Sequence, residues 1–165
     1  MLNNSLSLFY KMRRKVVELD DLDIALLNKL RYRANKSLTI LSRELEVPIS
    51  TVRYRIKRLE EQGVIQGYVA IVDRDNLGYK ISLVLEVETV PKMVERVAKD
   101  MSQINEIVRI YELDSGPKLH VHALFKDERE AYSFITDKLY NLRGVISVST
   151  SRIIKRYKVD PSIIV

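Results

Sequence analysis

The sequence predicts an α+β protein in which three helices precede a β-α-β-β-α-β region. Apolar residues recur at helical spacing through residues 20–62 and change to alternating, strand-like runs after residue 78. The five glycines and four prolines punctuate these runs as stops and turns. A chain of 165 residues is long enough for one ordinary domain or two small ones.

The first helix is expected to begin after Asp20, which can cap it, with Asp23 three residues on. A second helix follows a break in the pattern, capped by Ser37 or Thr39. The third runs from about Ile49 to Gln62, after a tight connection. The expected inward positions are Leu22, Leu26 and Leu30, then Ile40, Leu41 and Leu45, then Val52, Ile56 and Leu59.

Residues 64–72 predict a strand or a short hairpin. The remainder predicts strands over 81–87, 107–113, 119–125 and 145–154. Two apolar stripes predict the helices between these strands. The first stripe is Met93, Val94, Val97, Met101 and Ile104, and the second is Tyr132, Ile135, Leu139 and Leu142. This order is the split β-α-β unit of ferredoxin-like folds.

Charge is distributed unevenly along the chain, whose net charge is +6. Residues 1–66 hold 13 Lys and Arg against 8 Asp and Glu, a balance of +5, and residues 67–165 hold 15 against 14, a balance of +1. The basic N-terminal part favours a polyanionic partner, with double-stranded DNA more common than an anionic membrane. The absence of cysteine excludes disulfides and thiolate metal sites and fits a reducing cytosol. The charge-free opening, Met1 to Tyr10, is shorter than the roughly 20 apolar residues of a membrane span. Because it also precedes its basic residues, secretion is not expected.

The third helix carries the features of a DNA-recognition helix. With its apolar stripe facing the core, the other side presents Ser50, Thr51, Arg53, Tyr54, Lys57 and Arg58, with Arg55 toward one flank. A helix fits the major groove of B-DNA, and residues near its N-terminus reach base edges. Arg53 is therefore expected to read bases, whereas Lys57 and Arg58 lie further along and are expected to contact phosphates.

The run STVRYRIKRLEEQGVIQGYVAIVD, after LDDLDIALLNKL, resembles the Lrp/AsnC (feast/famine) family of prokaryotic transcription regulators. The resemblance covers about residues 19–158. It implies a winged helix-turn-helix DNA-binding domain at 19–66, a linker at 67–78, and a ferredoxin-like domain at 79–165 that assembles oligomers and binds effectors. It also implies a sequence-specific regulator that binds pseudo-palindromic operators as a dimer or larger oligomer, cytoplasmic and associated with the nucleoid.

Two departures from the family pattern stand out. The family usually has a glycine in the turn and a serine capping the recognition helix, where this chain has Glu46 and Pro48. The effector loop, around Ser115 and Gly116, has Leu119 where the family usually has an aspartate. Since an α-amino group favours a carboxylate partner, we expect a weak response, or none, to common amino acids.

The N-terminal extension, residues 1–18, admits two interpretations. The basic run 11–15 predicts either an arm that follows the DNA backbone or an inert tail, and translation could begin at Met12 instead of Met1.

The predicted sheet has an outer face that the helices do not cover. We expect Val84, Val108 and Ile110 to lie there and a second subunit to pack against them. His120 and His122 should share one face, and Glu112 on the neighbouring strand would be needed to complete a metal site. No metal and no cofactor is expected, because the chain has no cysteine and no further histidine to support one.

Other function classes remain as alternatives. A nucleoid-type protein that compacts DNA would use the same basic residues, and a footprint would distinguish it by uniform coverage in place of discrete half-sites. A small ferredoxin-like enzyme is disfavoured, because the sequence has no phosphate loop, acid–base pair or nucleophile elbow.

Overall fold

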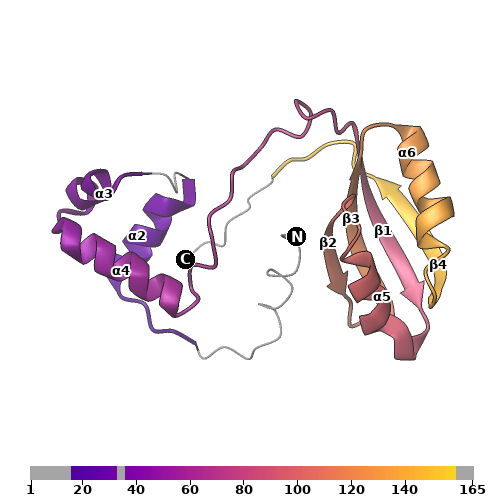
Figure 1. Cartoon of the computed structure of the whole chain (residues 1–165), viewed down its shortest axis with the longest axis horizontal. Helices are drawn as coiled ribbons and strands as arrows, with labels where there is room; N and C mark the ends of the chain where they lie inside the picture. Colours follow the sequence, from indigo (N-terminus) through magenta and orange to yellow (C-terminus); the bar gives the residue numbers. More distant parts are fainter. Residues whose placement is uncertain (1–15, 33–35, 159–165) are drawn as a thin grey trace. The chain divides into compact units, whose positions relative to one another are not determined.

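The computed structural model describes residues 16–32 and 36–158. The described chain divides between Ile71 and Val72 into an N-terminal and a C-terminal unit (Figure 1). The basic run 11–15 and Met12 lie outside the described residues. Our expectations for them, and for the exact domain boundaries, therefore stay predictions.

The N-terminal unit contains the three expected helices, α2 (Asp21–Tyr32), α3 (Leu38–Leu45) and α4 (Ile49–Glu61). At the start of α2, Asp20 and Asp23 each accept a hydrogen bond from the other's backbone N–H, at 2.9 and 3.2 Å, which confirms the predicted cap. Ser37, not Thr39, caps α3. The core consists of Leu26, Leu30, Leu41, Val52 and Leu59. Ile40 was expected to face inward, but 44% of it is exposed, because Leu41 occupies the buried position of that turn.

The turn between α3 and α4 contains a left-handed residue. Glu46 has φ 57° and ψ 37°, and it is the one described non-glycine residue with positive φ. Its N–H and that of Val47 both donate to the carbonyl of Ser42, so the turn closes the end of α3. The conformation explains why a glycine suits this position, since a Cβ costs roughly 1–2 kcal/mol there.

The prediction of a strand or hairpin at 64–72 is wrong, because these residues form no strand in the structure. The N–H groups of Val64 and Ile65 both donate to the carbonyl of Leu59, so the chain closes onto the end of α4. Beyond that point no neighbouring strand is available among the described residues to complete a ladder. Val69 and Ile71 are accordingly 79% and 71% exposed.

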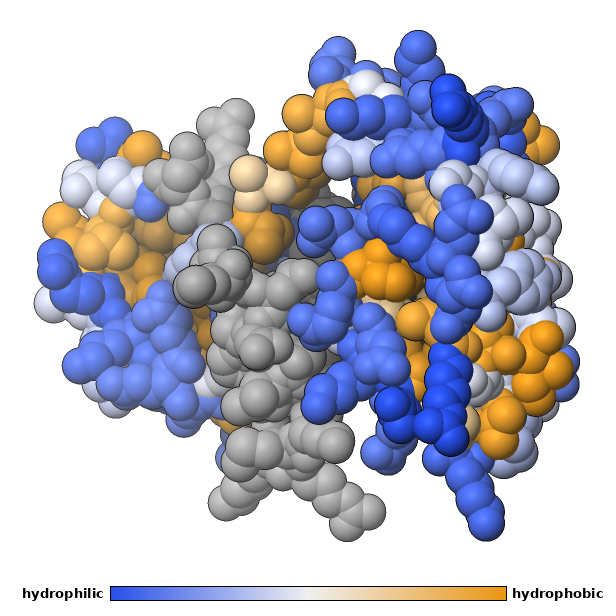
Figure 2. Space-filling view, turned by 45° about the vertical axis from the view of Figure 1, so that its right-hand side comes forward, coloured by the Kyte–Doolittle hydropathy of each residue, from blue (hydrophilic) through white to orange (hydrophobic). Residues whose placement is uncertain are grey.

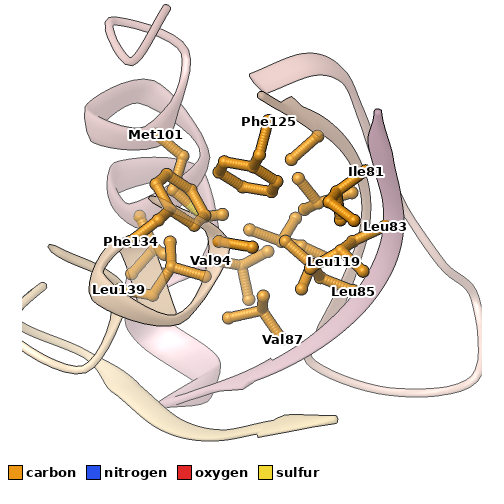
Figure 3. Close-up of a cluster of buried hydrophobic side chains, with 14 residues drawn as sticks. Ile81, Leu83, Leu85, Val87, Val94, Met101, Leu119, Phe125, Phe134 and Leu139 are labelled. Carbon is orange, nitrogen blue, oxygen red and sulfur yellow. The ribbon is translucent and has the colours of Figure 1, made fainter. Parts of the chain in front are cut away.

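The C-terminal unit has the predicted β-α-β-β-α-β order (Figure 1). Its elements are β1 (Ile81–Thr89), the 3-10 turn η2 (Pro91–Met93), α5 (Val94–Met101), β2 (Ile107–Glu112), β3 (Lys118–Phe125), α6 (Glu128–Ser133), the π-helical segment η3 (Phe134–Leu139) and β4 (Val145–Arg152). The sheet is antiparallel with strand order β2-β3-β1-β4. Alternate residues of β1 and β3 pack against α5, α6 and η3 in one apolar core (Figure 3), in which the rings of Phe125 and Phe134 lie 4.9 Å apart.

Two residues lie on the opposite face from the one that simple periodicity predicts. In the last helix, Phe134 and Leu139 are buried and five residues apart, a spacing that the π-helical segment brings onto one face. Tyr132, which was expected to face the core, is 71% exposed. In β2 the pairing with β3 shifts between Ile107 and Arg109, and this bulge turns Ile110 into the core. The prediction that Ile110 lies on the outer face is therefore wrong.

The Glu46→Gly substitution should stabilise the N-terminal unit by about 0.5–1 kcal/mol, because relief of the left-handed strain exceeds the added entropy of the unfolded chain. Urea unfolding followed by helical circular dichroism measures the effect. Arg43→Gly, within α3, is the matched control and should cost about 1 kcal/mol. Equal destabilisation by both substitutions would contradict the strain argument.

Candidate nucleic-acid interface

The exposed face of α4 carries most of the predicted DNA-binding residues. Ser50, Arg53, Tyr54 and Lys57 are exposed, and Thr51 is half-buried. Val52 and Leu59 on the opposite side are buried, so the core fixes which face points outward. The structure thus brings a hydroxyl group, a guanidinium and an ammonium onto one helical surface, as the periodicity predicted.

Arg55 and Arg58 are held within the protein. Arg55 contacts the carboxylates of Asp20 and Asp23, with 3.2 Å between its Nη1 and Asp23 Oδ1, and Arg58 Nη2 contacts Asp23 Oδ2. The side chain of Asp23 is fully buried, whereas the two arginines are 21% and 28% exposed. Their guanidiniums therefore join α4 to the start of α2 as well as adding positive charge.

Within this network, Asp20 and Arg55 each stabilise the charged form of the other. The hydrogen bond from Arg55 lowers the pKa of Asp20, with help from the N–H of Asp23. The same hydrogen bond raises the pKa of Arg55. One atom remains without a partner among the described residues, because Arg58 Nε is buried and makes no hydrogen bond.

Sequence reasoning assigned Asp20 and Asp23 to the cap and missed their ion pairs. The partners are 32 and 35 residues apart, so no local spacing could reveal them. The sequence held one signal of these ion pairs, which is the excess of arginine on α4. Arg55 in particular lies toward the flank that packs on α2.

The N-terminus of α4 has no side-chain cap, as the proline predicted. The carbonyl of Pro48 accepts hydrogen bonds from the N–H groups of Thr51 and Val52, at 3.0 and 3.2 Å. Ser50 supplies no cap. A helix N-terminus carries partial positive charge, which favours an approaching phosphate.

At the C-terminal end of α4, Glu60 accepts a hydrogen bond of 2.8 Å from the hydroxyl of Tyr68. Burial, followed by this carboxylate, raises the pKa of Tyr68 to about 12. Lys57 is 3.6 Å from Glu61, and both side chains are mostly exposed. Such a pair is weak and leaves Lys57 able to turn toward a phosphate.

The loop that corresponds to the effector loop is tied to the end of β1. The carbonyl of Pro117 accepts hydrogen bonds from both the N–H and the hydroxyl of Thr89, at 2.9 and 3.0 Å. Ser115 and Gly116 are exposed, but Leu119 is 1% exposed and packs in the core opposite Val87. Leu119 therefore has no free surface for an effector.

The two histidines of β3 do lie on one face, with their Nε2 atoms 3.0 Å apart. Glu112, the third ligand that a metal site would need, pairs with Leu119 and so belongs to the opposite face. No group of three potential metal ligands occurs in the described part of the chain. Nor is any described helix long and apolar enough to span a membrane.

Comparison with known proteins identifies both regions of the chain. Residues 19–66 match the family model described as winged helix-turn-helix DNA-binding, and residues 82–163 match the Lrp/AsnC ligand binding domain. The transcriptional regulator Ptr1 of Methanocaldococcus jannaschii is 31% identical over 140 residues, which cover 85% of this chain and 95% of that protein. LrpA of Pyrococcus abyssi is 30% identical over 140 residues, covering 84% and 99%.

Solved structures agree in fold. A regulator of Neisseria meningitidis in complex with L-methionine has a TM-score of 0.84 at 22% identity, covering 88% of this chain and 96% of that one. AsnC of Escherichia coli has a TM-score of 0.81 at 16% identity, with coverage of 87% and 97%. With the two domain matches and the archaeal relatives, these findings show that the chain belongs to the Lrp/AsnC family of transcriptional regulators.

Proposed function

We propose that this regulator binds a pseudo-palindromic DNA operator as a dimer or larger oligomer, with one α4 helix in each major groove. The observation that carries the proposal is the outward face of α4, where Arg53, Tyr54 and Lys57 surround an uncapped helix N-terminus. DNA binding, not catalysis, is the function that this surface supports.

The arginines of α4 divide into two roles. Arg53 is exposed and has no ion pair among the described residues, so its guanidinium is available to bond guanine with two donors. Arg55 and Arg58 are occupied by Asp20 and Asp23 and act mainly by orienting α4. We narrow the base-reading and phosphate-contacting set to Ser50, Thr51, Arg53, Tyr54 and Lys57, because Arg58 contacts Asp23 and its Nε is buried.

Two surfaces of this chain are candidates for the contact with a second copy. The outer sheet face around Val84, which lies between His122 and Ser151, is more polar than the sequence suggested. The run Tyr68–Val72 is apolar and exposed, and an unpaired β-prone segment of this kind favours pairing with another strand. Figure 2 shows apolar residues interspersed with hydrophilic ones on the visible face of the molecule. We assign the dimer contact to these two surfaces together.

The C-terminal unit matches a ligand-binding domain, so the chain has the domain with which the family binds effectors. Residue 119 is a buried leucine, so no carboxylate stands at the position where the family supplies one for an amino group. We therefore propose that common amino acids bind this chain weakly or not at all.

The Arg53→Ala substitution should weaken operator binding by roughly 1–3 kcal/mol and relax preference at one base position, because a base contact is lost. Lys57→Ala should weaken all sequences alike and lower the salt slope by about one. Footprints and salt-dependent gel shifts measure both effects, with half-site centres expected about 10–10.5 base pairs, or a multiple, apart. Uniform DNA coverage, or unchanged preference in Arg53→Ala, would contradict the proposal.

The Asp23→Asn substitution should destabilise the N-terminal unit by roughly 3 kcal/mol, because it leaves the partly buried guanidinium of Arg58 without a charged partner and that of Arg55 with Asp20 alone. Asp21→Asn, two residues earlier and exposed, is the matched control and should cost below about 1 kcal/mol. Urea unfolding of the full chain measures the difference. If both variants were equally stable, the network would not hold α4 in place.

The Val84→Arg substitution should split dimers, because it places a charge on the surface assigned to the second copy. Tyr132→Arg, on the helix-covered side of the sheet and 71% exposed, is the control and should leave assembly unchanged. Light scattering measures the mass of each variant, and gel shifts its affinity. An unchanged mass for Val84→Arg would exclude the outer sheet face as the dimer contact.

A further inference from the structure

Two histidines lie side by side on the outer face of the sheet. His120 and His122 belong to β3, between β1 and β2, and both are half-buried. Their Nε2 atoms are 3.0 Å apart, so one nitrogen donates a hydrogen bond and the other accepts it. Two protonated Nε2 atoms would be two donors facing each other, so the pair can take up only one proton while this bond is kept.

The strands beside β3 present one cation, one carboxylate and two uncharged groups to the histidine pair. Arg109 of β2 and Val84 of β1 lie in register with His122, and Tyr111 of β2 and Glu86 of β1 with His120. Beyond β1, β4 contributes hydroxyl groups at Ser149 and Ser151. Glu86 is exposed and forms no ion pair with any described residue. A proton on the pair therefore adds a charge that no ion pair among the described residues neutralises.

The charges that the four strands place on the outer face cancel while the two rings are neutral. Two cations lie there, Arg109 and Lys118, and two carboxylates, Glu86 and Glu88. Glu88 is in register with Lys118 and accepts a hydrogen bond of 3.0 Å from Ser147. A face without net charge can be covered by an identical face, because a two-fold dimer brings the same surface from both copies together. One proton on each histidine pair would give both faces the same positive charge.

We propose that the histidine pair makes dimer assembly depend on pH. Two copies associate through this face while the rings are neutral, and the dimer weakens as each pair takes up a proton. This regulation rests on the dimer contact proposed above. An imidazolium loses more favourable hydration on burial than a neutral imidazole does, and the second copy brings an equal charge that repels it. Because paired operator contacts need the dimer, the same protonation lowers operator affinity.

The surroundings of His122 set the direction of the pH effect. Burial lowers the pKa of His122, and the charges of His120, Arg109 and Arg74 lower it further. A second copy adds to the burial, so the pKa is lower in the dimer than in the monomer, and the dimer binds fewer protons. A complex that binds fewer protons than its separated parts loses stability as the pH falls. Since the pKa of His122 lies below its ordinary value of 6.5, the affinity of the dimer should be constant well above that pH and fall below it.

Sedimentation equilibrium of the full chain, without DNA and with EDTA to exclude bridging metal ions, measures the dimer Kd against pH. We expect the Kd to rise at least about tenfold between about pH 7.5 and about pH 5.5, because each proton taken up weakens the dimer by up to about tenfold per pH unit. The double variant His120→Gln, His122→Gln should remain dimeric, with a Kd that no longer changes. Circular dichroism at both pH values checks that the chain stays folded.

Two neighbouring residues should shift the pH at which the dimer weakens, in opposite directions. Arg109→Gln removes a cation in register with His122, so protonation of the pair becomes easier and the loss begins at higher pH. Glu86→Gln removes the carboxylate in register with His120, so protonation becomes harder and the loss begins at lower pH. Ser151→Ala, an uncharged change on the same face, is the matched control and should keep the profile of the unaltered chain.

Three results would overturn the proposal: a Kd that does not change with pH, a dimer that tightens as the pH falls, or full pH dependence in the double variant. A tighter dimer at low pH would mean that a carboxylate of the second copy pairs with the protonated rings. A stable dimer whose Kd does not change with pH overturns the pH dependence alone and leaves the dimer contact and operator binding intact. A chain that is monomeric at about pH 7.5 overturns the dimer contact as well.

Discussion

The carboxylate of Asp23 is the point on which the N-terminal unit depends. It is fully buried, accepts a hydrogen bond from the N–H of Asp20 at the start of α2, and contacts arginines from two successive turns of α4. Burying an ion costs several kcal/mol, and only paired and hydrogen-bonded geometry offsets that cost. The arrangement therefore specifies one orientation of α4 on α2, which the apolar contacts of Val52 and Leu59 alone would allow to vary.

This constraint also decides how charge is used on the recognition helix. Periodicity alone assigned four basic residues to the DNA surface, yet the carboxylates of α2 engage two of them. A helix with fewer free cations binds any DNA less tightly, because phosphate contacts dominate non-specific affinity. The fraction of affinity that depends on sequence is then larger, which suits a regulator better than a compacting protein.

Periodicity predicted the elements well and failed where the backbone leaves ideal geometry. The three helices, the order of strands and helices along the chain and the cap at Asp20 follow from local spacing. Ile110 and Tyr132 could not be placed, because a bulge and a π-helical segment each shift the residues that face the core. The strand expected at 64–72 failed for a different reason, since a strand needs a partner and no described strand pairs with this segment.

The net charge of the C-terminal unit does not reveal how its charges are arranged. Residues 67–165 sum to +1, which the sequence alone suggests is an electrostatically neutral surface. Screening limits charge interactions to about 8–10 Å at physiological ionic strength, so the local arrangement matters more than the sum. Carboxylates such as Glu106 and Glu128 are paired with Lys138 and Arg152 on the helix side, whereas Arg109, on the outer face, forms no ion pair among the described residues. A second copy that packs on this face must accommodate this positive charge.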